Sequence, residues 1–489
     1  MRFWLQIKNI ICNFATANSL DMKNLIGRTY ENELLKRCYN SGRAEFVIIS
    51  GRRRVGKTYL VNNLYEKEYA FSYVGGHHLT QKQQLQRFAL VLKKYAKSPM
   101  SIELKNWFDA FDRLKEYLLS LRRRRIVVFF DEMPWIDSWK SDFVSALEYF
   151  WNSWGAQNDN LMFIASGSAT SWLNDNIVEN KGGLHARITR HIYLEPFTLK
   201  ETEQYLVSKG IRWDRYQIVQ AYMVFGGVPF YLSLLDGGIS LAQNIDELFF
   251  SAKAQLRHEF DELYNALFSN SDKYISIVKA LSQKKQGMVR NEILKMTGIQ
   301  GSVLTKILKN LEKCSFITTF SQFGNTSRNT IYRLSDFYTL FYFKFVEENH
   351  SKDRKWWSNN LNLPSINAWQ GFSFELICLL HTDQIKTKLG ISGISTSVSA
   401  WKNATSQIDL VIDRADRTIN VCEIKFSVNP YEITREYADR IRMRNANFVS
   451  ATKTRKGIIS TFVTTYGVKQ GVNSSVVMSE VTMDDLFAE

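Results

Sequence analysis

Short apolar runs alternate with amphipathic runs along the first part of the chain. FVIIS at 46–50, IVVFFDE at 126–132 and LMFIASGS at 161–168 are rich in β-branched and aromatic residues. Continuous apolar runs of this kind are typical of buried parallel strands. Between them, LQRFALVLKKY at 85–95 and DFVSALEYFWNSW at 142–154 have the spacing of amphipathic helices. This alternation predicts an α/β fold, with a parallel sheet and helices on both faces.

The pattern changes after residue 200. Residues 201–271 carry mostly helical periodicity, which predicts a helical subdomain. Residues 272–345 predict short helices and then two strands, with Gly324 and Asn325 at the turn between the strands. The last of these helices has its apolar residues on one face: Leu304, Ile307, Leu308 and Leu311. From about residue 365 to the end, a helical run and alternating strands predict a further α/β unit.

Composition and charge narrow the class of protein. The chain has 489 residues, of which 45% are hydrophobic, so it can bury the cores of roughly two to four domains. Lysine and arginine exceed aspartate and glutamate by 63 to 48, a formal net charge of +15. That charge favours a polyanionic partner, with DNA first, although simple solubility is the alternative.

The cysteines and the hydropathy of the chain indicate the cellular setting in which we expect the protein. The five cysteines are scattered and none forms a C-x-x-C pair. This distribution argues against a disulfide framework or a zinc ribbon and favours a reducing, cytoplasmic setting. No apolar run approaches the roughly 20 residues that a membrane span needs, so we expect no membrane association.

The run GRRRVGKT at 51–58 lies between a strand-like run and a helical pattern. It has the G-x-x-x-x-G-K-T spacing of a P-loop in the expected context. Lys57 is expected to reach the β- and γ-phosphates, and the Thr58 hydroxyl to bind Mg²⁺. The loop residues whose backbone is expected to wrap the phosphates are Gly51, Arg52, Arg53, Arg54, Val55 and Gly56. The sequence therefore predicts a site for ATP and Mg²⁺.

A second motif follows in RRRRIVVFFDE, an apolar strand that ends in Asp131 and Glu132. Asp131 is expected to hold Mg²⁺ through water, and Glu132 to orient or deprotonate the attacking water. The next strand places Ser166 and Ser168 near its end, where a hydroxyl can touch the γ-phosphate; an ordinary strand-end serine is the alternative. Arg187 is a candidate arginine finger, which would stabilise transition-state charge, with a surface arginine as the alternative.

Together these motifs resemble the archaeal-type ATPase family, a branch of the AAA+-like P-loop NTPases. The matching segments are IGRTYENELL (26–35), GRRRVGKT (51–58), FFDEMPW (129–135), ASGS (165–168), LEPF (194–197) and FGGVPFYL (225–232). The resemblance covers roughly residues 25–345. It implies ATP binding, with slow hydrolysis coupled to a conformational change, and it names no substrate.

The same resemblance implies roles for residues outside the P-loop. The segment with Gly27 and Arg28 would lie over the adenine. Gly227 and Pro229 would act from the helical lid near the nucleotide. The family often has Gly-Arg at the arginine-finger position, whereas Ala186 precedes Arg187 here.

Helices followed by a hairpin wing predict a winged helix-turn-helix within residues 272–350. Lys306, Lys309 and Lys313 lie largely on the solvent side of its last helix, where they could contact DNA phosphates while the helix enters a major groove. That helix lacks an obvious Arg, Asn or Gln set for reading bases. An internal or protein-docking winged helix is the alternative.

Near the end of the chain, IDLVID at 408–413 and INVCEIKF at 419–426 predict two strands joined by a turn. Paired as a hairpin, they would place Asp409 opposite Glu423 or one position away, with Lys425 on the same face as Glu423. Glu375 lies on a predicted helix that can pack beside this hairpin. Carboxylates on neighbouring strands can hold Mg²⁺ or Mn²⁺, and a lysine beside them can position water or neutralise developing charge.

This constellation resembles the PD-(D/E)XK restriction-endonuclease-like superfamily. The resemblance implies that Glu375 is the helix acid, Asp409 and Glu423 are metal ligands, and Lys425 is the catalytic lysine. The proline that usually precedes the first acid is replaced by Ile408. A solvated hairpin face is the alternative interpretation of these charges.

Two functional hypotheses follow. The first is an ATP-hydrolysing, DNA-associated protein whose nucleotide state controls a nuclease-like tail. The second is an ATP-dependent signalling or defence switch with an inactive tail that binds DNA or a partner. A homo-oligomer is one form in which the protein could assemble. The expected domains are an N-terminal extension or mis-called start (1–21), a P-loop ATPase core (22–200), a helical lid (201–271), a winged helix-turn-helix with its connector (272–350) and the nuclease-like domain (365–489).

Overall fold

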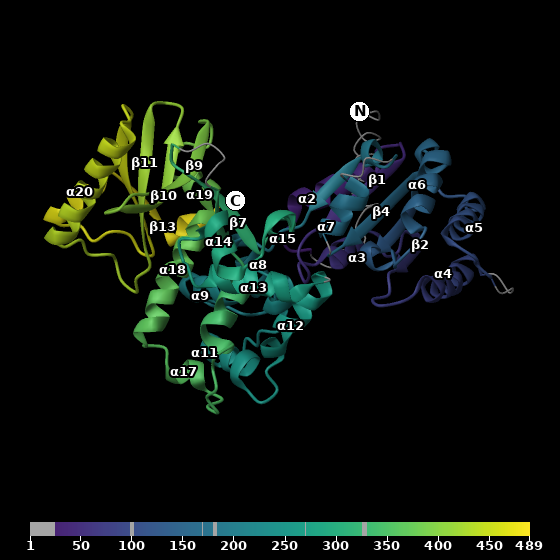
Figure 1. The fold of residues 1–489 in the computed structure, drawn as a ribbon, viewed down its shortest axis with the longest axis horizontal. Helices are drawn as coiled ribbons and strands as arrows, with labels where there is room; N and C mark the ends of the chain where they lie inside the picture. The colour runs from purple at the N-terminus through teal and green to yellow at the C-terminus, as the bar shows by residue number, and fades with distance from the viewer. Residues whose placement is uncertain (1–24, 98–101, 169, 179–182, 269, 325–329) are drawn as a thin grey trace, which may run out of the picture. The chain divides into compact units, whose positions relative to one another are not determined.

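The computed structural model of the 489-residue chain describes residues 25–97, 102–168, 170–178, 183–268, 270–324 and 330–489 (Figure 1). The expected N-terminal extension therefore lies outside the described residues. The described chain divides into two compact units. The first comprises the segments up to Ser50, Gly56–Gly167 and Trp172–Tyr193, and the second comprises Gly51–Val55, Ser168–Ser171 and Leu194–Glu489.

The first unit is built on a parallel five-stranded sheet of order β2-β3-β4-β1-β5. Its strands are β1 (Glu45–Ser50), β2 (Tyr69–Val74), β3 (Ile126–Asp131), β4 (Leu161–Gly167) and β5 (Arg190–Tyr193). Its longer helices are α2 (Thr29–Tyr39), α3 (Lys57–Tyr65), α4 (Gln81–Ala96), α5 (Trp107–Leu119) and α6 (Phe143–Ser153). The predicted α/β class and the parallel sheet of the ATPase core are confirmed.

The core of this unit explains why these runs form strands. Every residue of β1, β3 and β4 is buried, as expected for parallel strands that are covered on both faces. Phe46, Phe130 and Phe163 from these strands pack in one cluster with Trp107 of α5 and Trp151 of α6. Burial of such large aromatic side chains is a main source of stability in a core.

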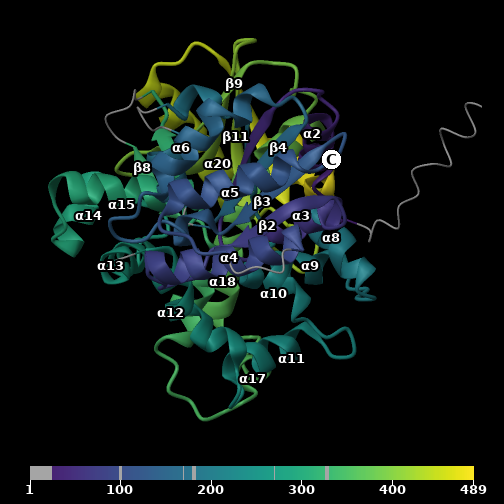
Figure 2. The same cartoon turned by 90° about the vertical axis from the view of Figure 1, so that its right-hand side faces the viewer.

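The second unit begins with helices and ends with a mixed sheet. Its first part contains α8 (Leu199–Ser208), α9 (Arg215–Phe225), α10 (Pro229–Ser233), α11 (Leu241–Ile245), η5 (Asp246–Phe250) and α12 (Gln255–Leu267). Its middle part contains α13 (Ser271–Ser282), β6 (Met288–Val289), α14 (Arg290–Thr297), α15 (Gly301–Lys313), β7 (Ile317–Gln322), β8 (Ile331–Leu334), α16 (Phe337–Phe341), η6 (Tyr342–Val346) and α17 (Trp356–Asn359). Figure 2 shows α11 and α17 side by side, where the N–H of Trp357 donates to the Asp246 carboxylate at 2.8 Å.

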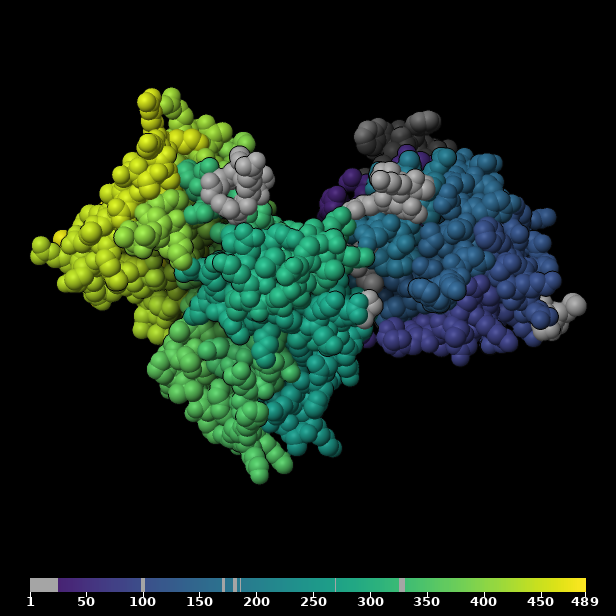
Figure 3. Space-filling model, in the orientation of Figure 1, coloured from purple at the N-terminus to yellow at the C-terminus, as the bar shows by residue number. Residues whose placement is uncertain are grey.

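The last part carries the predicted tail. It contains α18 (Pro364–Leu380), α19 (Thr382–Lys388), β9 (Thr396–Lys402), β10 (Gln407–Arg414), β11 (Thr418–Lys425), α20 (Arg435–Thr452), β12 (Gly457–Thr464) and β13 (Ser479–Thr482). Leu410 and Cys422 pack toward α18, whereas Val411 and Val421 pack with Phe448 of α20. The sheet is therefore covered by one helix on each face, and Figure 3 shows the yellow α20 segment on the surface of this unit.

The hairpin β7–β8 joins the tail sheet, which the sequence did not predict. The sheet has the order β13-β12-β11-β10-β9-β7-β8-β6, because β7 pairs in parallel with β9 through Ser321↔Ser399 and Gln322↔Ala400. Phe323 extends this junction: its ring packs edge-on against Phe448, with ring centroids 5.0 Å apart. The predicted hairpin is thus one end of a sheet that includes the tail.

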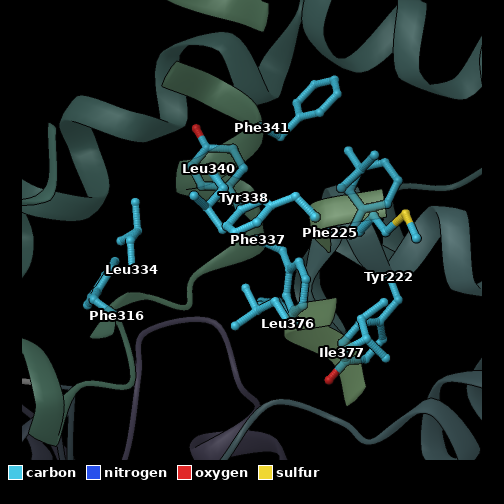
Figure 4. Packing of buried hydrophobic residues seen from close by; sticks show 14 of the residues in the cluster. Tyr222, Phe225, Phe316, Leu334, Phe337, Tyr338, Leu340, Phe341, Leu376 and Ile377 are labelled. Atoms are coloured by element: carbon cyan, nitrogen blue, oxygen red, sulfur yellow. The ribbon is translucent and has the colours of Figure 1, made fainter. Parts of the chain in front are cut away.

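The centre of the second unit is an aromatic and aliphatic cluster (Figure 4). Tyr222 and Phe225 of α9 contribute to it, together with Phe337 of α16 and Leu376 of α18. The Tyr222 and Phe337 rings meet edge-on at 5.3 Å. The short helix α16, which follows the hairpin, therefore packs in one cluster with α9 and α18. Among the helices of the described residues, none is long and apolar enough to cross a membrane.

Candidate nucleotide site and candidate tail site

The predicted P-loop follows the end of β1 and leads into α3. Gly56 stands at the start of α3 with φ 92°, a left-handed conformation that disfavours residues with a side chain. A Cβ on Gly51 would overlap the carbonyl oxygen of Leu194. Lys57 is the first residue of α3 and is almost fully buried. A loop that ends at a helix N-terminus presents backbone N–H groups and the positive end of the helix dipole, which together favour a phosphate.

Three predicted polar residues meet at the carboxyl ends of the strands. The Thr58 hydroxyl donates to the Asp131 carboxylate at 2.8 Å, and the Ser166 hydroxyl donates to the other oxygen of the same carboxylate. Asp131 ends β3, Ser166 lies near the end of β4, and Thr58 lies in the first turn of α3. Asp131 is only 4% exposed, so its charge lies in a largely water-free position.

The geometry of Thr58 and Asp131 fits a magnesium ion. Mg²⁺ takes oxygen ligands at about 2.0–2.1 Å in an octahedron, which separates neighbouring ligands by roughly 2.9 Å. The two oxygens of Thr58 and Asp131 are 2.8 Å apart. These two residues would hold the ion that accompanies a nucleotide, directly or through water, and the ion would supply positive charge beside the phosphates.

Glu132 follows this carboxylate directly. Its φ of 47° is left-handed, and it begins the short helix η1 (Met133–Trp135). Its N–H donates to Asp131 at 3.0 Å, and its carbonyl accepts from Trp135 N–H at 2.9 Å. A non-glycine residue held in this conformation is a recurrent feature of functional sites, because the surrounding structure must stabilise the strained backbone.

The remaining residues predicted for the first unit occupy defined positions. Gly27 and Arg28 both have left-handed backbones, with φ of 65° and 58°, immediately before α2. The Arg28 guanidinium is buried, 3.9 Å from Glu31. Arg187 is exposed in the short helix η4 (His185–Arg187). The adenine contact of Gly27 and Arg28 and the finger role of Arg187 stay predictions.

The predicted lid motif lies in the second unit. Gly227 has φ 64°, and its carbonyl accepts from the N–H of Phe197 at 2.7 Å. A Cβ at this position would overlap the Phe197 carbonyl oxygen, which also accepts from the Tyr222 hydroxyl at 2.8 Å. Pro229 is the first residue of α10, where its missing N–H costs nothing. The motif thus joins LEPF to FGGVPFYL through backbone contacts.

Two P-loop arginines lie in the segment Gly51–Val55, which belongs to the second unit, and are bound by carboxylates of that same unit. Arg52 pairs with Asp336, and Arg54 pairs with Glu259. Their side chains therefore meet protein carboxylates, and the predicted phosphate contacts of these residues would come from backbone N–H groups. The carboxylates were missed because they lie 284 and 205 residues away in the sequence, and no local pattern marks them.

The tail hairpin has the predicted pairing. β10 and β11 are antiparallel with Leu410 opposite Cys422, and Asp409 and Glu423 are the next residues beyond this pair at one end of the ladder. Lys425 Nζ lies 2.8 Å from the Glu423 carboxylate, so these two residues share a sheet face as expected. Burial, and then the charge of Asp409, raises the pKa of Glu375 to about 7. Asp409 itself accepts a hydrogen bond from Gln407 at 2.5 Å.

Cationic groups surround the tail carboxylates. The Glu423 carboxylate accepts from Arg444 Nη1 and from the Tyr437 hydroxyl, both of α20. Burial alone would raise the pKa of Glu423, but Arg444 and Lys425 hold it below the usual value. Arg333 of β8 is buried 4.0 Å from Glu375, and burial lowers its pKa. Arg333, Tyr437 and Arg444 were missed, because a helix or strand approaching from elsewhere leaves no sequence signal.

The tail residues do not fit a metal ion in this arrangement. Within the described parts of the chain, no three carboxylate, thiol or imidazole side chains are close enough to hold one. The Glu423 carboxylate is instead bound by Lys425, Arg444 and Tyr437, and Glu375 lies 4.0 Å from Arg333. The predicted roles of Glu375, Asp409, Glu423 and Lys425 in a metal-dependent reaction therefore stay predictions.

A parallel sheet with a P-loop after β1, and with a carboxylate at the end of the nearby strand β3, defines a P-loop nucleotide-binding domain. Comparisons with known proteins agree. Residues 26–235 match a family described as an ATPase domain predominantly from Archaea. This part of the chain is therefore similar to ATPase domains of the archaeal type.

Similar proteins extend beyond that domain. An uncharacterized protein of Methanocaldococcus jannaschii is 23% identical over 425 residues, which are 85% of this chain and 91% of that protein. The Walker-type ATPase of Pyrococcus abyssi is 18% identical and covers 66% of this chain and 97% of its own, with a TM-score of 0.49. The ORC2 protein of Aeropyrum pernix in its ADPNP–ADP complexes is 14% identical, covers 74% and 97%, and has a TM-score of 0.39.

Proposed function

We propose that this ATPase couples its nucleotide state to a DNA-associated C-terminal region with a nuclease-like domain. The observation that carries the ATPase part is the convergence of Thr58, Asp131 and Ser166 beside the N-terminus of α3. Lys57, at that N-terminus, would bind the β- and γ-phosphates. Glu132, next to Asp131, would orient or deprotonate the water that attacks the γ-phosphate. Arg187 would supply positive charge to the transition state, and Gly27 and Arg28 would lie over the adenine.

DNA association is supported by the middle part of the second unit. α13, α14 and α15 precede the β7–β8 hairpin, and β6 pairs with β8. Helices followed by such a small sheet are the arrangement expected of a winged helix-turn-helix. Lys306 and Lys309 are exposed on α15, whose apolar residues Leu304 and Leu308 are buried. The exposed face of α15 is therefore basic and free of core residues, as a phosphate-contacting helix requires.

A specific observation favours a second function for the tail. The Glu423 carboxylate meets Lys425, Arg444 and Tyr437, so a cation would have to displace two positive side chains before it could bind there. The charge of Glu423 is thus already neutralised by protein cations. A tail of this kind would bind DNA or a protein partner without cutting it, and the ATPase would act as a switch that controls this binding, as a monomer or as a homo-oligomer.

One experiment separates the two functions. The full-length chain would be incubated with single-stranded, duplex and branched DNA in Mg²⁺ or Mn²⁺, with and without ATP, and both binding and cleavage would be measured. The first function, and the second where the bound partner is DNA, predict DNA binding that weakens with salt and depends on nucleotide. Cleavage that Lys425→Ala abolishes would make the tail a nuclease, and Lys57→Ala would show whether ATP is needed.

The control is Lys469→Ala, which removes an exposed lysine of the same unit, paired with Glu432. Binding without cleavage in every reaction would support the switch. A chain that binds no DNA in any nucleotide state, under salt as low as 50 mM, would contradict the DNA association itself.

A further inference from the structure

Arg54 of the P-loop is fixed to α12 by a two-point ion pair. Its Nε donates to Glu259 at 3.0 Å and its Nη2 donates to the other carboxylate oxygen at 2.7 Å. The Arg54 guanidinium also lies 3.9 Å from the centroid of the Phe230 ring. Glu259 is only 4% exposed and accepts a longer hydrogen bond, 3.4 Å, from the Tyr231 hydroxyl. This geometry fixes both the direction and the plane of the guanidinium.

Arg52 is bound through a single nitrogen to Asp336, which immediately precedes α16. Its Nη2 lies 3.0 and 3.1 Å from the two oxygens of Asp336, and Arg52 is 1% exposed. Asp336 also caps α16, because its carboxylate accepts from the Thr339 N–H at 3.0 Å and the Thr339 hydroxyl at 2.6 Å. The N–H of Asp336 donates to the Phe316 carbonyl at the start of the β7–β8 hairpin. Asp336 thus connects the P-loop to α16 through its carboxylate and to that hairpin through its backbone N–H.

Buried ion pairs of this kind are weak sources of net stability. Their mutual attraction is largely offset by the cost of removing both charges from water, whereas loss of one partner leaves a costly unpaired charge. What they do supply is geometry. Two such pairs on alternate residues of one loop constrain the backbone that would wrap the phosphates. Glycines stand at both ends of the constrained segment, at Gly51 and Gly56.

We propose that Arg52 and Arg54 are positioning residues that couple the P-loop to α16 and α12. A phosphate bound by the loop backbone changes the position of the loop, and the two ion pairs transmit that change to Asp336 and Glu259. This inference rests on the proposed function, since it needs ATP at the P-loop. By linkage the coupling is reciprocal. If ATP changes the affinity of the β7–β8 hairpin for a ligand by some factor, that ligand changes the affinity for ATP by the same factor.

The test uses hydrogen exchange of the full-length chain. Exchange of peptides that cover α12 and α16 is measured with and without Mg²⁺ and a non-hydrolysable ATP analogue. In the wild type, the analogue is expected to slow exchange in both peptides by at least about threefold. Glu259→Gln and Asp336→Asn, which keep size and hydrogen bonding but remove the charge, are expected to abolish this effect in α12 and α16 respectively. Arg54→Lys, which keeps the charge, is expected to retain part of it.

The matched control is Glu292→Gln, which removes an exposed ion pair with Lys284 in the same unit. It is expected to leave the nucleotide effect unchanged. Analogue binding with full protection of both peptides in Glu259→Gln and Asp336→Asn would overturn the coupling and leave the ATPase proposal intact. A wild-type chain that binds no analogue would overturn both. If Asp336→Asn fails to fold, the exchange of α12 in Glu259→Gln tests the proposal by itself. The Arg54 side chain of that pair is 23% exposed.

Discussion

At the scale of single residues, Asp131 organises the nucleotide site. Its two oxygens are shared between Thr58 and Ser166, and the next residue, Glu132, is held in a left-handed backbone. Hydrogen bonds from two hydroxyls fix the position of this carboxylate, and a carboxylate in a fixed position is preorganised for a cation. The sequence predicted Thr58, Asp131 and Ser166 as separate candidates from their positions after strands, and the structure brings them into contact.

His381, at the end of α18, carries a pH dependence. The ring is buried, with Nδ1 2.9 Å from the Ile377 carbonyl and Nε2 3.1 Å from the Leu199 N–H. Nδ1 therefore donates and Nε2 accepts, which requires the neutral ring. Burial lowers the pKa of His381 to about 4 from 6.5. Between pH 4 and 6.5 the histidine is protonated in the unfolded chain but neutral in the folded chain. The free energy of unfolding therefore falls as the pH drops from 6.5 to 4.

The expected loss over that window is about 3 kcal/mol, from the size of the pKa difference. Urea unfolding at several pH values would measure it. His381→Gln should flatten the dependence between pH 6.5 and 4, while His350→Gln, an exposed histidine, should leave it as in the wild type. An unchanged pH slope in His381→Gln would refute this role.

At the scale of elements, local patterns could be predicted from the sequence, whereas pairing between distant strands could not. The strands of the first unit, the P-loop context and the tail hairpin were predictable, because apolar periodicity and turn residues are local. The pairing of β7 with β9 was not, since two edge strands that are distant in sequence meet without any local signal. The same holds for Arg333 and Arg444, which reach the tail carboxylates from other elements.

Gly227→Ala tests the turn that precedes α10. The new Cβ would meet the Phe197 carbonyl oxygen in a backbone of φ 64°, so we expect a loss of about 3 kcal/mol or more in unfolding free energy. Gly210→Ala is the matched control: its φ is 79°, but nothing lies within 4 Å of its Cβ position. It should lose only about 1 kcal/mol, the cost of the left-handed backbone. Equal losses in urea unfolding would show that the contact with Phe197 is unimportant.

At the scale of the whole molecule, the second unit joins parts that the sequence suggested as successive domains. Its central cluster includes residues of α9, α16 and α18, and its sheet includes both the β7–β8 hairpin and the tail. The boundaries predicted for the lid, the winged helix and the tail stay predictions. A continuous core and a continuous sheet mean that a displacement of α16 affects both the hairpin and the tail. This continuity is the physical basis for proposing that nucleotide state reaches the region that we propose to bind DNA.

The most direct measurement of the central claim is MgATP hydrolysis by the full-length chain, with nucleotide binding measured in parallel. Glu132→Gln should lower kcat by roughly 100-fold or more, the usual contribution of a general base, while the Kd for MgATP changes by less than about threefold. Lys57→Ala should abolish hydrolysis, and Glu116→Gln, an exposed acid of the same unit, should do neither. A wild-type chain without MgATP hydrolysis, or hydrolysis that survives both substitutions, would contradict the account.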